Sequence, residues 1–181
     1  VALIAEEAQI VPGQTFYVAL DFKLQPHWHL YWQNPGASGL PVEIEWQLPE
    51  GLRAGAIQWP APERIEVAGL TNYGYEDAVT LMVPLQAAET LPTGESIVLQ
   101  AEVFWLVCKE LCLPGDARLS LTLPVARESS PSADAPRFDA ARARLPRTSL
   151  PWELAAAIDG GQLVLTVQSG AGEPIPSDLY V

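Results

Sequence analysis

Apolar and polar residues alternate at every second position in several short stretches of the chain. In the clearest stretch the apolar positions are Phe16, Val18, Leu20, Phe22 and Leu24. The same period recurs in residues 42–48, 79–85, 97–107 and 119–123. A period of two is that of a β-strand with one buried face, so the pattern predicts a strand in each of these stretches.

Turn-forming residues separate the predicted strands. They occur at Pro12-Gly13, Asn34-Pro35-Gly36, Pro49-Glu50-Gly51, Pro92-Thr93-Gly94 and Pro114-Gly115. Many short strands with intervening turns and almost no helical periodicity indicate an antiparallel sandwich or barrel. We expect the all-β sandwich. The Cys…Trp…Cys spacing of antibody domains is absent, so the two cysteines are not expected to form an inter-sheet bridge of that kind.

The composition changes after residue 126, which predicts a domain boundary. We expect a β domain over residues 1–126 and a linker with a short helix over residues 127–149, because the segment begins rich in serine and proline. Within it, residues 138–145 are the expected helix, which Pro146 ends.

The last part of the chain returns to strand-like patterning. Residues 152–158 and 163–167 form a predicted hairpin around Asp159-Gly160-Gly161. A two-stranded unit is only marginally stable alone. We therefore expect residues 150–181 to begin a second β domain, or to pack as strands on the first.

The net charge of -12 argues against two classes of partner. Nucleic acids and anionic membrane surfaces both require clustered lysine and arginine. No stretch of about 18 apolar residues and no signal segment is present, so we expect an excised or processed soluble piece. Contact with a membrane is expected only through other parts of a longer protein.

The only two cysteines, Cys108 and Cys112, are separated by three residues and lie at the predicted turn end of a hairpin. A bridge that closes so short a loop removes little chain entropy from the unfolded state. That favours a disulfide that opens and closes over one kept for stability. A static surface disulfide in a non-catalytic β-sandwich binding module remains an alternative. A copper site is another, in which His27 or His29 would supplement the cysteines, and the two histidines would share one side of an extended segment.

The residues around the pair give it an apolar setting. Lys109 favours a thiolate and Glu110 opposes it, so local charge does not decide which cysteine attacks. Trp105 and Leu111, with neighbouring aliphatic residues, could dock a partner or shield the thiols.

Four motifs together carry a resemblance to a known family. They are His-Leu-Tyr-Trp-Gln-Asn-Pro-Gly-Ala-Ser-Gly-Leu-Pro at 29–41, Trp-Pro-Ala-Pro-Glu-Arg at 59–64, Leu-Thr-Asn-Tyr-Gly-Tyr-Glu at 70–76, and Trp-Leu-Val-Cys-Lys-Glu-Leu-Cys-Leu-Pro at 105–114. In this order they resemble the amino-terminal periplasmic domain of the DsbD family of thiol:disulfide interchange proteins, closest to the ScsB (suppressor of copper sensitivity) branch. The resemblance covers roughly residues 1–126.

The resemblance implies an immunoglobulin-like fold and a place in an electron relay. Family members are inner-membrane protein-disulfide reductases whose amino-terminal domain faces the periplasm. That domain receives electrons from a thioredoxin-like domain of the same protein and passes them to periplasmic thioredoxin-fold clients. The exchange needs no bound cofactor and no metal.

The resemblance also implies roles for particular residues. Cys108 and Cys112 would be the exchanging pair. Independently of the resemblance, Trp105, Lys109 and Leu111 are expected to dock the partner because they lie around the pair. In DsbD a loop that carries a Phe caps the oxidised pair. The matching segment here is Asn72, Tyr73, Gly74 and Tyr75, in which Asn72 takes the place of the Phe. Either tyrosine could cap instead, or capping could be absent and the tyrosines could serve ordinary loop or core packing. Glu76 and Asp77 lie next to this segment. They could help proton transfer, but solvated loop carboxylates are the preferred interpretation.

Overall fold

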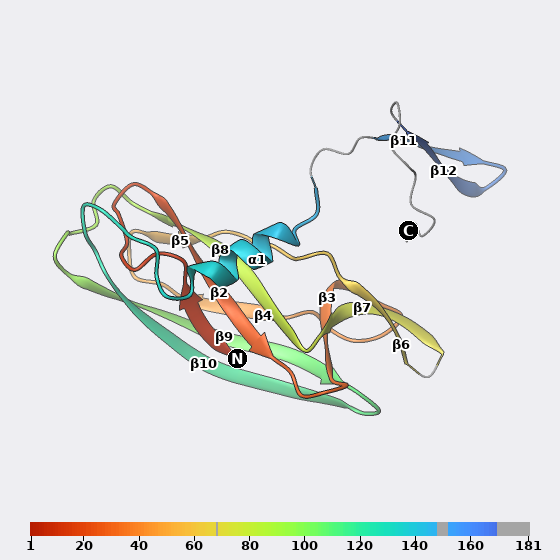
Figure 1. Ribbon diagram of the computed structural model, residues 1–181, viewed down its shortest axis with the longest axis horizontal. Helices are drawn as coiled ribbons and strands as arrows, with labels where there is room; N and C mark the ends of the chain where they lie inside the picture. The colour runs from red at the N-terminus through yellow and green to blue at the C-terminus, as the bar shows by residue number, and fades with distance from the viewer. Residues whose placement is uncertain (68, 148–151, 170–181) are drawn as a thin grey trace. The chain divides into compact units, whose positions relative to one another are not determined.

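The chain forms two units, Val1–Pro146 and Arg147–Val181. The computed structural model describes residues 1–67, 69–147 and 152–169 (Figure 1). Two antiparallel sheets make up most of the first unit, which confirms the predicted immunoglobulin-like sandwich. Among the described helices, none has the length and hydropathy needed to cross a membrane.

The first sheet has four strands in the order β1-β2-β8-β5. Their bounds are Ala2–Ala5 for β1, Thr15–Lys23 for β2, Ala78–Ala87 for β8 and Leu52–Ala54 for β5. β2 and β8 are two of the predicted strands, and their apolar alternation places one face of each in the core. Phe16, Val18, Leu20 and Phe22 are all buried.

The second sheet has six strands, in the order β10-β9-β3-β7-β6 with β4 also paired to β9. Their bounds are His29–Gly36 for β3, Glu43–Gln47 for β4, Glu63–Val67 for β6, Leu70–Glu76 for β7, Ser96–Cys108 for β9 and Cys112–Pro124 for β10. β9 is long enough to pair with two strands in succession. β4 lies opposite residues 100–104 of β9, and β3 lies opposite residues 107–108.

The turn predicted at Asn34-Pro35-Gly36 is wrong, because these residues continue β3. The strand absorbs them through a shift in register against β7 between Tyr31 and Gly36. Gly36 has a φ of 87°, and any side chain there would collide with the backbone of Thr71, so a glycine is required for this close approach. The predicted strand at residues 42–48 is confirmed as β4.

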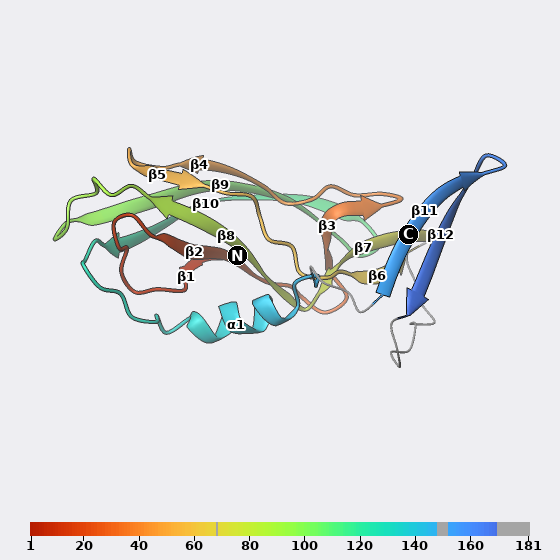
Figure 2. The same cartoon turned by 90° about the horizontal axis from the view of Figure 1, so that it is seen from above.

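The core lies between the two sheets, which face each other in layers (Figure 2). Leu20 and Leu81 of one sheet and Leu99 and Val103 of the other belong to the same buried cluster. Apolar surface removed from water in this way supplies the main favourable term in folding.

Helix α1, Ala135–Ala143, lies on the outer face of the β1-β2-β8 layer (Figure 2). It begins three residues before the predicted helix, with Pro136 in its first turn, where a proline costs no hydrogen bond. Phe138 is fully buried in a small cluster with Ile4 and Met82. Asp21 of β2 accepts a hydrogen bond from Arg137 at 3.0 Å. The outer face of β2 is therefore covered by the segment predicted to be a linker.

The second unit contains the predicted hairpin. β11, Trp152–Asp159, pairs with β12, Gln162–Ser169, and Asp159 lies opposite Gln162. Gly160 and Gly161 between them both have positive φ, as a two-residue hairpin turn requires. The predicted second domain over residues 150–181 stays a prediction, and its last twelve residues, 170–181, lie outside the described residues.

Candidate functional site

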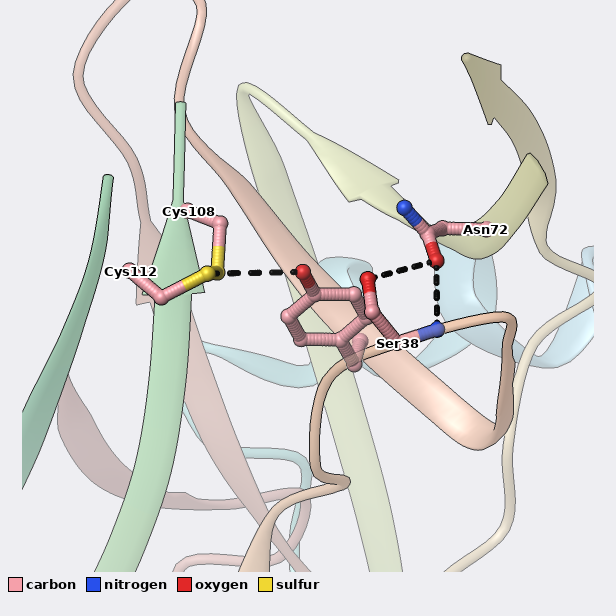
Figure 3. Close-up of a disulfide and its surroundings, with 5 residues drawn as sticks. Ser38, Asn72, Cys108 and Cys112 are labelled. Atoms are coloured by element: carbon pink, nitrogen blue, oxygen red, sulfur yellow. Dashed lines mark hydrogen bonds between the residues drawn. A yellow bond between two sulfur atoms is a disulfide. The ribbon is translucent and has the colours of Figure 1, made fainter. Parts of the chain in front are cut away.

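The cysteine pair closes the end of the β9–β10 hairpin, as predicted. Cys108 is the last residue of β9, Cys112 is the first of β10, and the two lie opposite each other in the ladder. They form a disulfide with their Cα atoms 4.1 Å apart (Figure 3). Lys109, Glu110 and Leu111 form the turn between them and are all exposed.

The two sulfur-bearing residues differ in exposure. Cys108 is 3% exposed, whereas Cys112 lies at the surface. Thiol–disulfide exchange begins with attack on a sulfur that the incoming thiolate can reach. By exposure, Cys112 is therefore the cysteine that an incoming thiolate could reach.

A row of side chains crosses the sheet from the disulfide. Cys108 lies opposite Cys112 on one side and opposite His29 of β3 on the other, and His29 in turn lies opposite Glu76 of β7. Residues directly opposite in an antiparallel sheet project from the same face. Tyr31, two residues beyond His29, shares that face. It is the outer face, because Leu30, the residue between them, belongs to the core.

The side chain of Tyr31 contacts the disulfide. Its hydroxyl lies 3.8 Å from the Cys112 Sγ (Figure 3), and its ring is stacked edge-on against His29 with centroids 5.1 Å apart. The ring is buried because Gly39 lies directly on it, so closely that a Cβ at Gly39 would collide with the ring atoms.

Asn72 holds the loop that covers Tyr31. The Asn72 Oδ1 accepts hydrogen bonds from the backbone N–H and the hydroxyl of Ser38, each at 3.0 Å (Figure 3). Asn72 is 2% exposed, and both bonds are partly buried. The chain from Ala37 to Pro41 is thus fixed over the aromatic ring beside the disulfide.

The four residues predicted to form a cap all lie on β7, but they face different ways. Asn72 and Gly74 project to the outer face, where Gly74 lies opposite Tyr31. Tyr75 points into the core and donates a hydrogen bond to the Pro60 carbonyl at 2.7 Å. Burial raises the pKa of Tyr75 well above its ordinary value. Tyr73 is half-buried and lies opposite Arg64 of β6. The capping role of these residues stays a prediction.

Comparison with known proteins places the chain in a family. The model described as "Thiol:disulfide interchange protein DsbD, N-terminal" matches residues 1–124. This chain belongs to the DsbD N-terminal domain family. The predicted resemblance is thereby confirmed, and the match ends two residues before the predicted boundary.

Two solved structures are similar to this member of the DsbD N-terminal family. The N-terminal periplasmic domain of ScsB from Proteus mirabilis is 24% identical with a TM-score of 0.64, and the match covers 92% of this chain and 62% of that chain. The N-terminal domain of DsbD from Neisseria meningitidis, in the reduced form, is 13% identical with a TM-score of 0.36, over 72% of this chain and 90% of that chain. This chain thus spans less than two thirds of the ScsB domain. No curated protein sequence matches it significantly.

The residues predicted to dock a partner lie at the disulfide end of the β9–β10 hairpin. Lys109 and Leu111 are on the turn, and Leu111 is 75% exposed. Trp105 faces inward, edge-on to Phe22 with centroids 5.4 Å apart. Phe104, one residue earlier, projects to the outer face that carries the cysteines. The docking role of Trp105, Lys109 and Leu111 stays a prediction.

A shallow groove beside the disulfide was not predicted from the sequence. It has a volume of about 290 Å³ and is lined in part by Leu40, Phe104, Leu106 and Pro114. Leu40 is 64% exposed. Leu40 belongs to the covering loop, and the other three belong to β9 and β10. No local sequence pattern indicates this groove, because it depends on β3 and β4 both pairing with β9.

The two histidines do not share one side of a strand. His27 is exposed and lies in the turn before β3 with a φ of 70°, so the extended geometry expected for residues 27–29 is wrong. His29 is buried, and burial lowers its pKa, while the nearby Glu76 opposes this shift. Within residues 1–67, 69–147 and 152–169 no three metal-binding side chains cluster. Copper binding by fewer ligands stays an untested alternative.

Glu76 and Asp77, for which proton transfer is the alternative interpretation, have different surroundings. Glu76 ends β7 opposite His29, in the row that leads to the disulfide. Asp77 follows with a φ of 57°, and its carbonyl accepts a hydrogen bond from the Leu24 N–H at 2.7 Å. Geometry therefore favours Glu76 for any such role.

Proposed function

We propose that this domain is the periplasmic thiol–disulfide exchange module of a transmembrane protein-disulfide reductase. The observation that carries the proposal is a disulfide at the tip of a long hairpin, with one buried and one exposed cysteine, in a chain of the DsbD N-terminal family. Electrons arrive from a thioredoxin-like domain of the same protein. They leave to periplasmic thioredoxin-fold clients.

The exposure of Cys112 defines the order of bond changes. A thiolate of the donor attacks the Cys112 Sγ, a new donor–Cys112 disulfide forms, and the Cys108–Cys112 bond breaks with its electron pair on Cys108. The donor's second thiol loses its proton and attacks the mixed disulfide, which releases Cys112. The donor loses two electrons and two protons, and Cys108 and Cys112 gain them. No bound cofactor takes part.

The apolar surface around the tip supports docking of a thioredoxin-fold partner. Leu111 is exposed in the turn between the cysteines, and Leu40 and Phe104 are exposed along the groove that Leu106 and Pro114 also line. Exposed apolar groups that gather in one region mark an interaction surface. Burying them in a complex excludes water from the exchanging sulfurs while leaving Cys112 in the path of an attacking thiolate.

A trapping experiment tests the proposal. The oxidised chain is mixed with a thioredoxin-fold protein whose resolving cysteine has been replaced by serine, and the products are separated under non-reducing conditions. We expect a mixed disulfide, and peptide mass spectrometry should locate it at Cys112. The Cys112→Ser variant, reduced and blocked before mixing, is the control and should give no such product.

Two results would contradict the proposal. One is the absence of any mixed disulfide under conditions in which the partner reduces a small disulfide. The other is a reduction potential far below about -300 mV, which would indicate a structural bridge.

A further inference from the structure

His29 is a buried histidine whose packing does not explain why a polar side chain is present at this position. It is 2% exposed, and its Nε2 has no hydrogen-bond partner among the described residues. A buried polar atom without a partner destabilises the fold, so such atoms are rare and call for an explanation. Its ring packs edge-on against Tyr31, but a phenylalanine would pack equally well.

The position of His29 relative to the leaving sulfur suggests the explanation. His29 lies directly opposite Cys108 in the β3–β9 ladder. The Cβ atoms of such a pair are about 4.5–5.5 Å apart on the same face of the sheet. The imidazole and the Cys108 sulfur therefore project side by side from neighbouring strands.

Few charged and titratable groups of the described residues face His29. Glu76 faces it from β7, Cys108 from β9, and Tyr31 shares its own strand, while Cys112 lies one strand beyond Cys108. Burial lowers the pKa of His29, with a smaller opposing effect from Glu76. In the oxidised protein the imidazole is therefore neutral at pH 7 and retains one N–H.

We propose that His29 stabilises the Cys108 thiolate that is released when the disulfide opens. The role rests on the proposed exchange function. When the donor's thiolate bonds to Cys112, the electron pair of the broken bond resides on the Cys108 Sγ, which is buried at 3% exposure. A buried thiolate needs a hydrogen-bond donor or a counter-charge. The neutral imidazole supplies its N–H, and it can then take up the proton that the donor's second thiol loses.

Coupling between the two groups predicts a reciprocal change in their titration. The thiolate of Cys108 favours the protonated imidazole, and the protonated imidazole favours the thiolate. We therefore expect the pKa of His29 to be higher in the reduced protein than in the oxidised one. A histidine that only packs against Tyr31 would titrate alike in both states.

The first test follows the thiolate. In the full-length chain with Cys112→Ser, Cys108 is the sole thiol, and its titration is measured by the ultraviolet absorbance of the thiolate. Adding His29→Phe should lower the thiolate fraction at pH 7 by about tenfold or more, a shift of about one pKa unit. Adding His27→Phe, the same change at the exposed histidine, should leave the titration unaltered. An unchanged curve in a folded His29→Phe variant would overturn the proposal.

The second test uses the unsubstituted protein, so it does not depend on the folding of a variant. Nuclear magnetic resonance follows the imidazole signals of His29 and His27 through a pH titration of the oxidised and reduced chains. A rise in the pKa of His29 on reduction, with His27 unmoved, is the expected result. Equal titration of His29 in both states would refute its coupling to Cys108.

Neither test requires a redox partner, so the two proposals can fail separately. If His29 and Cys108 titrate together but no mixed disulfide forms with a thioredoxin-fold protein, the exchange function is wrong and the coupling stands. If the mixed disulfide forms and the titrations are independent, the role of His29 is wrong and the exchange function stands.

Discussion

Gly39 lies on the ring of Tyr31 in a backbone conformation with a φ of 98°. Both features oppose any side chain there: a positive φ is strained for other residues, and a Cβ would collide with the ring. Gly94 has a similar φ of 90°, but a Cβ added there would meet no atom within 4 Å. Comparing a substitution at Gly39 with one at Gly94 therefore distinguishes the cost of backbone strain from the cost of crowding Tyr31.

We predict that Gly39→Ala lowers the free energy of unfolding by more than Gly94→Ala does. The backbone strain alone costs about 1–3 kcal/mol at either site, and displacement of Tyr31 adds to it only at Gly39. Chemical denaturation of the oxidised variants measures the difference. Equal losses would show that the loop moves away from the ring without cost.

His29 also makes stability depend on pH. Its pKa is lowered in the folded state, so between that value and the ordinary value of 6.5 the unfolded chain holds a proton that the folded chain does not. Stability is therefore fully present above about pH 6.5 and falls as the pH decreases below it.

We predict that His29→Phe removes this acid sensitivity. The loss due to His29 in the unsubstituted protein is at most about 1.4 kcal/mol per pH unit, since one proton is involved. Urea unfolding at about pH 7.5 and about pH 5.5, on either side of the ordinary histidine pKa, gives the comparison. Glu7, whose pKa is raised mainly by burial, changes stability in the opposite direction at lower pH and is common to both proteins. An equal decrease in both proteins would contradict the prediction.

Among the elements, the alternating pattern predicted β2, β4, β8, β9 and β10 because each places apolar side chains on the core at every second position. It did not predict β7, where the outward positions include Asn72 and Gly74. Asn72 is polar because it binds the loop over Tyr31, and Gly74 has no side chain because the Leu30 carbonyl lies against it. The site-forming strand thus lacks the hydrophobic period on which strand prediction depends.

The same reasoning explains what was predicted at the site. The strand pattern on either side located the cysteines at a hairpin end, but the predicted turn residues Pro114 and Gly115 lie inside β10. These local features carried no information on β3, which supplies Tyr31 and His29 to the site. Tyr31 is 81 residues away from Cys112 in the sequence. The contact arises from sheet order, which local patterns do not specify.

Helix α1 supports a prediction at the scale of an element. Phe138 is fully buried against the outer face of β2 and β8. Phe138→Ala should therefore cost about 3–5 kcal/mol of unfolding free energy, the usual range for a buried phenylalanine. Phe104→Ala, the same change at an exposed position of β9, is the matched control and should cost far less. Denaturation monitored by tryptophan fluorescence measures both, and similar losses would mean that α1 is not docked in solution.

For the whole molecule, the relevant question is where the folded domain ends. The predicted boundary at residue 126 lies two residues beyond the end of the family match at residue 124. The structural unit extends to Pro146, because residues 129–132 bond to the segment around Gln9 and α1 covers Ala19 and Met82. The family match and the folded unit therefore end at different residues. The folded unit also includes α1 and the segment that leads to it.

We predict that a chain ending at residue 146 is more stable than one ending at residue 126. The shorter chain exposes the apolar cluster beneath α1 and leaves Asp21 without Arg137. Thermal unfolding of the two oxidised proteins provides the comparison. If their midpoints coincide, the domain is complete at residue 126 and the helix is an appendage.

The length of the β9–β10 ladder has a mechanical consequence. Thirteen residue pairs run from the disulfide to Ser96 and Pro124, a span of roughly 40 Å at the rise of an antiparallel strand. The ladder is held in the sheet along its length, because β9 pairs with β4 at residues 100–104 and with β3 at residues 107–108. Opening the bond therefore frees only the three-residue turn 109–111. Reduction is expected to leave the fold intact, because the ladder does not depend on the sulfur–sulfur bond.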